Sequence, residues 1–79
     1  MDHRWRVVII TVDGRRLAWR KNDRIHTLSP ELGPLWIANF KPAVFQVLSD
    51  GSLVPRGSSP DAVDVATVEL EADPRASNQ

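Results

Sequence analysis

The sequence predicts a small α+β fold in which a β-hairpin precedes two short helices, and a C-terminal peptide strand joins the hairpin edge to make a three-stranded sheet. Three observations predict it: an Asp-Gly pair between two β-rich runs, two apolar segments that each open near a proline, and an alternating run near the C-terminus. A chain of 79 residues has room for one small domain and a tail. Chains this short rarely enclose a deep catalytic cavity, so binding is favoured over catalysis.

The hairpin is predicted over residues 5–21. The run from Trp5 to Val12 is rich in β-branched residues, Asp13-Gly14 follows at once, and the next seven residues resume an alternating pattern. Asp-Gly suits a type I′ turn, which needs positive φ at both central residues. Such a turn pairs Val12 with Arg15, Ile10 with Leu17 and Val8 with Trp19. This register gathers one core face, which consists of Val8, Ile10, Val12, Leu17 and Trp19.

Two short helices are predicted after a loop over residues 22–27. Ser29 is a favourable N-cap, Pro30 suits the first helical position and Glu31 lies near the positive end of the helix dipole, so a helix should run to about Phe40. A second helix is predicted from Pro42 to about Ser49, with Asp50-Gly51 as its stop. Apolar residues at spacings of three and four can face the hairpin, namely Leu32, Leu35, Trp36, Phe40, Val44, Val47 and Leu48.

The segment Leu53-Val54-Pro55-Arg56-Gly57-Ser58 is a cleavage sequence commonly placed in fusion proteins for thrombin. It predicts an engineered, flexible linker over residues 51–59, which joins a basic domain of residues 1–50 to an acidic peptide of residues 60–79. Through Asp50 the chain has eight basic and five acidic residues, hence a charge of plus three. From Ser59 it has one basic and five acidic residues, hence minus four. Opposite charge can steer the two parts towards each other.

The acidic peptide is predicted to bind as a strand. Residues 63–70 alternate well enough for a strand and cannot form a core alone, so they should pair with the free edge of Arg15 to Lys21 by β-augmentation. The expected contacts on the domain are Arg15, Arg16, Ala18, Arg20, Lys21 and Arg24. Those on the peptide are Asp64, Val65, Val68, Glu69, Leu70 and Glu71, of which the apolar residues should supply most of the buried area.

Short motifs between Val8 and Leu48 resemble a known family. They are Val12-Asp13-Gly14-Arg15-Arg16-Leu17, Leu28-Ser29-Pro30-Glu31-Leu32, and Phe40-Lys41-Pro42-Ala43-Val44 with Leu48. They resemble the β-hairpin docking domains, of the tubulysin-synthetase type, at the N-termini of nonribosomal peptide synthetase and hybrid polyketide synthase subunits. Members usually carry a helix before the hairpin, whereas here Met1 to Arg4 precede it.

The resemblance implies a non-catalytic docking module. Such a module binds a short acidic motif at the C-terminus of the upstream subunit and so orders the subunits of an assembly line, as in antibiotic biosynthesis. The acidic peptide of residues 60–79 fits that partner in length and charge. The resemblance implies no cofactor and no enzymatic activity.

The alternative function is nucleic-acid binding by an Arg/Trp-rich hairpin. A charge of plus three is modest for that role, and an attached acidic peptide would compete with phosphates. The chain has no cysteine and no metal-ligand spacing, so we expect no metal site. The apolar stretch Val7 to Val12 is too short for a signal peptide or a membrane span, which favours a cytoplasmic location. We also expect the fusion to be monomeric.

Overall fold

The computed structural model describes residues 3–74, so residues 75–79 of the predicted peptide lie outside the described part. Within that part the chain forms eight strands, one α-helix and one 3₁₀ helix. The strands are β1 (Trp5–Thr11), β2 (Arg16–Ala18), β3 (Arg20–Lys21), β4 (Arg24–Ile25), β5 (Thr27–Leu28), β6 (Phe45–Val47), β7 (Leu53–Pro55) and β8 (Val63–Ala72). The helices are α1 (Leu32–Asn39) and the 3₁₀ helix η1 (Pro42–Val44).

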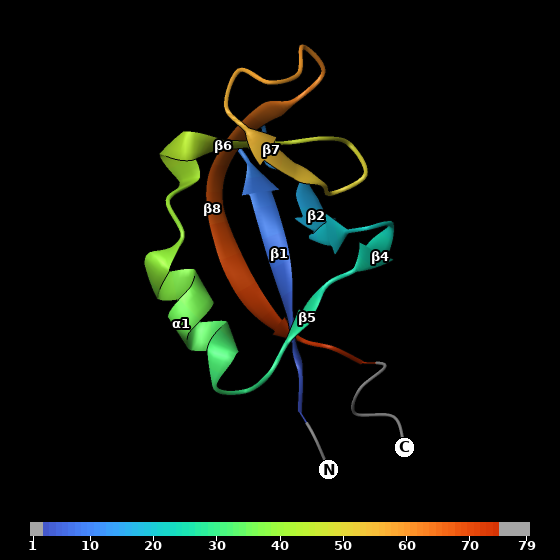
Figure 1. Ribbon diagram of the computed structural model, residues 1–79, viewed down its shortest axis with the longest axis vertical. Coiled ribbons are helices and arrows are strands. Elements are labelled where there is room, and N and C mark those ends of the chain that lie inside the picture. The colour runs from blue at the N-terminus through green and yellow to red at the C-terminus, as the bar shows by residue number, and fades with distance from the viewer. Residues whose placement is uncertain (1–2, 75–79) are drawn as a thin grey trace.

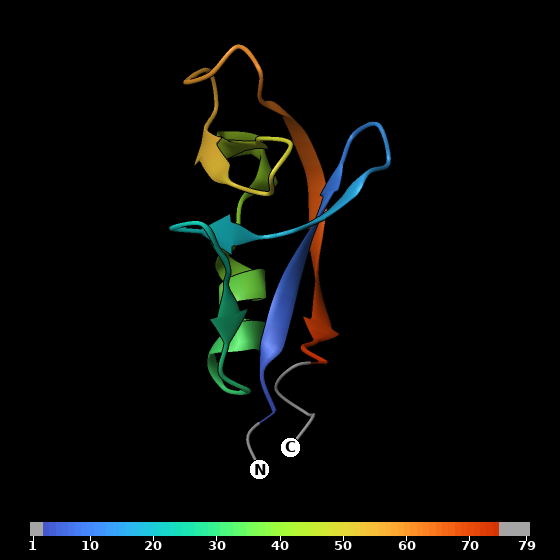
Figure 2. The ribbon, with the colours of Figure 1, turned by 90° about the vertical axis from the view of Figure 1, so that its right-hand side faces the viewer.

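Six strands form one antiparallel sheet. Its order is β2-β1-β8-β6-β7, and β5 pairs with the lower end of β1. The long strand β8 arcs from the β6–β7 hairpin down to the first residues of β1 (Figure 1). Strands β3 and β4 form a separate hairpin. Figure 2 shows α1 in a layer of its own beside the β1–β8 pair.

The core lies between the sheet and α1. Its buried cluster is Val7, Ile9, Leu28, Val47 and Val65, and the partly buried rings of Trp5, Trp19, Trp36 and Phe40 pack around it. Each aliphatic side chain buried in this way contributes roughly 1.5–3 kcal/mol. Because Val65 belongs to β8 and Val47 to β6, the C-terminal half of the chain supplies part of the core.

The predicted fold class is wrong, because the described residues form a mostly β structure with one short α-helix. The first predicted helix exists as α1, and the Ser29 hydroxyl accepts a hydrogen bond from the Leu32 N–H at 3.1 Å. The second is replaced by η1 and β6, whose Phe45 and Val47 favour strands. Gly51, the expected helix stop, instead closes the β6–β7 hairpin with φ at 95°.

The predicted hairpin register is also wrong, by one residue. Of the Asp-Gly pair, Gly14 alone has positive φ (89°), so the turn is a three-residue loop closed by the Thr11 N–H donating to the Arg15 carbonyl at 2.9 Å. The pairs are therefore Val8 with Ala18, Ile9 with Leu17 and Ile10 with Arg16. A slip of one residue exchanges the two faces of a strand. Val7 and Ile9 consequently enter the core, and Val12 is 64% exposed.

The expected type I′ geometry occurs at a different turn. Asn22 and Asp23 have φ of 54° and 64°, and they connect β3 to β4 within a segment that the sequence predicts as a loop. Asn and Asp tolerate this left-handed conformation better than other non-glycine residues. The β3–β4 hairpin places Lys21 directly opposite Arg24.

The predicted strand at the C-terminus exists, but it pairs with β1 rather than with Arg15 to Lys21. The edge predicted to receive it is partly occupied, since the Arg20 N–H donates to the Gly51 carbonyl at 3.0 Å and Arg20 bridges Ser52. The segment predicted as a flexible linker contains strand β7 and the buried Gly51. The division into a domain and an attached peptide stays a prediction.

Candidate functional site

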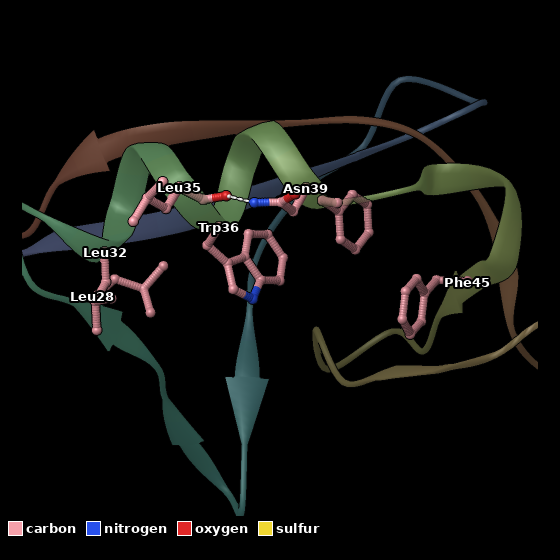
Figure 3. A pocket seen from close by; sticks show the side chains of 7 residues that line it. Leu28, Leu32, Leu35, Trp36, Asn39 and Phe45 are labelled. Carbon is pink, nitrogen blue, oxygen red and sulfur yellow. Dashed lines mark hydrogen bonds between the residues drawn. The ribbon is translucent and has the colours of Figure 1, made fainter.

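An apolar groove opens beside α1, with a volume of about 450 Å³ (Figure 3). We call it the apolar groove; it is lined by Leu28, Leu32, Leu35, Trp36, Asn39, Phe40 and Phe45. Leu32 and Leu35 are 56% and 59% exposed. Asn39 donates its side-chain amide to the Leu35 carbonyl at 2.8 Å, which leaves its own side-chain oxygen able to accept a bond.

The groove exists because α1 has no polar face. The helix carries no charged side chain from Leu32 to Asn39, whereas a surface helix normally turns a charged face to water. Gly33 is its buried residue and packs so closely on Trp5 that a Cβ there would lie 2.5 Å from Cδ1 of the indole ring. Because Gly33 packs against Trp5, Leu32 and Leu35 face outward.

Five aromatic rings form a continuous row of contacts beside the apolar groove. Trp19 contacts His26 at 4.4 Å and Trp36 at 4.7 Å, and the stack continues from Trp36 to Phe40 at 4.8 Å and to Phe45 at 5.2 Å, measured between ring centroids. Ring pairs of this kind contribute ~0.5–1.5 kcal/mol beyond their buried area. Burial, followed by the charges of Lys21 and Arg4, lowers the pKa of His26 below its ordinary value. The row therefore carries a neutral imidazole near pH 7.

Cationic side chains flank the groove. At Trp36 and Phe45 it adjoins a second hollow, which is also lined by Arg20, Lys21 and Ser52. Arg24 follows on β4, opposite Lys21. Within residues 3–74 no carboxylate lies within ion-pair distance of Arg20, Lys21 or Arg24. We call these three residues the cationic rim.

Comparison of the chain with family models, curated proteins and solved structures finds no significant match. The resemblance to docking domains therefore stays a prediction from short motifs. Among the residues described, no helix is long and apolar enough to cross a membrane. In the same part of the chain, no three His, Cys, Asp or Glu side chains gather as a metal site would require.

A second polar cluster lies on the opposite face of the sheet. Arg6 pairs with Glu71, and Arg16 lies 3.2 Å from Glu69 and 4.0 Å from Glu71. These residues share their face with Val8, which is 5% exposed, so the arginine stems help to cover it. Arg16 is thus close to Glu69 and Glu71, as predicted, but its strand β2 does not pair with β8, because β1 lies between them. Each such half-exposed pair contributes ~0–1 kcal/mol.

The other predicted contacts do not form between Arg15 to Arg24 and β8. Arg15 lies 3.4 Å from Asp13 in its own turn, and Asp64 receives hydrogen bonds from Arg56 and Gln46, each at 2.9 Å. Ala18 contacts Gly51 through its carbonyl. The remaining predicted residues are placed as follows: Arg20, Lys21 and Arg24 form the cationic rim, Val65 is in the core, and Val68 and Leu70 pack against it.

Sequence reasoning missed the groove because it assigned Leu32 and Leu35 to the side facing the hairpin. The available signal was the composition of the helix, which has more apolar positions than one buried stripe can hold. It also missed the partners that β8 finds, Arg6 and Arg56. Arg6 belongs to the strand that pairs with β8, and that pairing was assigned to the wrong strand.

Proposed function

We propose that this chain is a non-catalytic docking module, which binds a short segment of another protein that carries apolar and acidic side chains. The observation that carries the proposal is the junction of the apolar groove with the cationic rim at Trp36 and Phe45. Contiguous exposed apolar surface with a polar rim is typical of sites that bind proteins. The rim cations form no ion pair within residues 3–74, so they favour an acidic partner and accelerate the encounter.

Leucine or phenylalanine side chains of the partner fill the groove, where Leu32, Leu35 and Trp36 lose their contact with water. Each apolar side chain that is fully buried contributes roughly 1.5–3 kcal/mol, from which the cost of ordering the segment is subtracted. The indole N–H of Trp36 has no hydrogen-bond partner among residues 3–74, so it can donate to a backbone carbonyl of the bound segment. We expect micromolar affinity, about −8 kcal/mol.

An acidic partner agrees with the function that the motif resemblance implies. The ordering of synthetase subunits and the cytoplasmic location remain predictions from the sequence. The groove favours a protein partner over a nucleic acid, because the rings of Trp19, Trp36 and Phe40 stack on one another. Single-stranded nucleic acids need free ring faces on which their bases can stack.

The test uses a synthetic eight-residue peptide of alternating glutamate and leucine as the probe. Titration into the isotope-labelled chain should shift the NMR signals of residues 28–45 and of the cationic rim. Leu35→Glu places a carboxylate in the groove, so it should weaken binding by about tenfold or more. Added salt should weaken it further, since the rim charges are exposed.

Val12→Glu is the matched control. Val12 is an apolar side chain of comparable exposure, 64%, but it lies in the β1–β2 turn and outside the groove lining. The control should bind like the unchanged chain. Equal binding by the Leu35→Glu and Val12→Glu variants, or no binding of the peptide to the unchanged chain, would overturn the proposal.

A further inference from the structure

A polar hollow with a volume of about 620 Å³ lies beside the β3–β4 hairpin. We call it the hairpin hollow; it is lined by Lys21, Asn22, Arg24, Ile25, His26 and Thr27. Lys21 is directly opposite Arg24 in the strand pair, and the His26 N–H donates to the Trp19 carbonyl at 2.9 Å. Side chains alternate along a strand, and directly opposite residues share a face. Lys21, Arg24 and His26 therefore lie on one face of the hairpin.

The two cations of this face stand opposite each other without a counterion. Within residues 3–74 neither the Lys21 ammonium nor the Arg24 guanidinium has a hydrogen-bond or ion-pair partner. Asp23 carries the nearest carboxylate in the sequence, but it pairs with neither cation and does not line the hollow. Like charges directly opposite each other destabilise a strand pair. A bound anion would relieve this repulsion.

A third cation lies near the hairpin hollow. Arg4 donates to the Thr27 hydroxyl at 2.8 Å and to the Thr27 carbonyl at 3.1 Å, which holds its guanidinium beside the lining. The Thr27 hydroxyl accepts the bond from Arg4, so its own proton stays free to donate. Burial lowers the pKa of His26, and the charges of Lys21 and Arg4 lower it further. Since both cations act on one imidazole, positive charge converges on the hollow from two parts of the chain.

The donors of the hairpin hollow suit an anion with more than two oxygen atoms. N–H and O–H donors come from the side chains of Lys21, Asn22, Arg24 and Thr27, and with Arg4 the cations number three. A carboxylate offers one negative charge and two oxygen atoms. A phosphate monoester carries a charge of about −1.5 to −2 near pH 7 and has three strong acceptor oxygens. The phosphoryl group is therefore the better complement.

The hairpin hollow is continuous with the apolar groove. Lys21 and Asn22 also line the second hollow, which meets the groove at Trp36 and Phe45. We infer that the hairpin hollow binds a phosphoryl group carried by the docked segment, on a phosphorylated serine or threonine. This inference names an acidic group of the proposed partner and so rests on the proposed function. A segment that leaves the groove across the second hollow brings this group against Lys21 and Arg24.

Inorganic phosphate tests the hairpin hollow without the groove. Phosphate is titrated into the isotope-labelled chain, and sodium chloride at equal ionic strength is the reference. The amide signals of residues 21–27 should shift with phosphate and not with chloride. The pKa of His26, measured from its ring signals, should rise because the anion offsets the charges of Lys21 and Arg4.

Lys21→Gln removes one of the two opposed cations, and Lys41→Gln is the matched control. Lys41 is also exposed, but it lines neither the hairpin hollow nor the groove and forms no ion pair within residues 3–74. Lys21→Gln should weaken phosphate binding by about tenfold, whereas Lys41→Gln should bind like the unchanged chain. Thermal unfolding establishes that both variants are folded.

The second arm uses the glutamate-leucine octapeptide, extended at one end or the other by serine or by phosphoserine. One of the two phosphoserine peptides should bind about tenfold more tightly than its serine counterpart, and Lys21→Gln should remove most of that gain.

Each result decides the inference. It is overturned if phosphate shifts residues 21–27 no more than chloride does, or if Lys21→Gln and Lys41→Gln bind phosphate equally. Phosphate binding without a gain from either phosphoserine peptide would show that the hollow takes free phosphate, and would overturn the assigned source. Serine peptides that fail to bind overturn the groove, while inorganic phosphate reports on the hairpin hollow alone. The two failures are therefore distinguishable.

Discussion

At the scale of single residues, Gly51 holds the loop between β6 and β7 against Ala18 and Arg20. Its φ of 95° lies in the left-handed region, and its carbonyl accepts the Arg20 N–H at 3.0 Å. A Cβ at this position would overlap the Ala18 carbonyl of β2, a backbone atom that cannot move aside easily. Gly51→Ala should therefore lower the free energy of unfolding by more than the roughly 1–2 kcal/mol that left-handed strain alone costs. Urea denaturation measures the change.

Gly57→Ala provides the comparison for that measurement. Gly57 has a similar φ of 84°, but a Cβ there would meet no atom within 4 Å. This variant should lose roughly 1–2 kcal/mol from backbone strain alone. If both variants lose the same free energy of unfolding, the close contact between Gly51 and β2 adds no cost beyond that of backbone strain.

At the scale of elements, the β1–β2 hairpin decides which valines form the core. Val65, 5% exposed, lies opposite Thr11 on the buried face, whereas Val12 sits in the turn. Val65→Ala should cost on the order of 2 kcal/mol, from lost burial and the cavity left behind. Val12→Ala should change stability by less than about 0.5 kcal/mol. Chemical denaturation of the two variants checks the register, and the reverse order would favour the pairing that the sequence predicts.

The same hairpin shows what the sequence could and could not determine. The four residues Val7 to Ile10 are all apolar, so alternation could not choose between the two faces, and turn geometry made the choice. The start of α1 was predictable because Ser29 and Pro30 act locally. Residues 42–48 were not, because a short apolar run fits a helix or a strand equally well until β7 and β8 pair beside it.

At the scale of the whole molecule, the acidic segment is a structural strand as well as a source of charge. β8 joins β1 to β6, so the two parts of the main sheet meet through it. Part of the opposite charge of the two halves forms ion pairs within the fold. Arg6 pairs with Glu71, and Arg16 pairs with Glu69 and Glu71. The residues of the cationic rim are among the basic residues that form no ion pair within residues 3–74. The separation of charge along the chain thus leaves an unpaired basic surface beside the groove.

Cleavage at Arg56-Gly57 tests whether β8 is integral to the fold or an attached ligand. The Arg56 N–H donates to the Val44 carbonyl at 3.0 Å and its side chain binds the Ala43 carbonyl and Asp64, so thrombin should cut slowly until urea loosens this segment. Once separated from residues 57–79, residues 1–56 lack the central strand and Val65. So short a chain cannot replace that buried area. We therefore expect circular dichroism and NMR spectra of an unfolded chain, and recovery when the two fragments are mixed. A dispersed NMR spectrum of residues 1–56 alone would instead establish an independent domain, as the sequence predicts, with residues 57–79 as its attached partner.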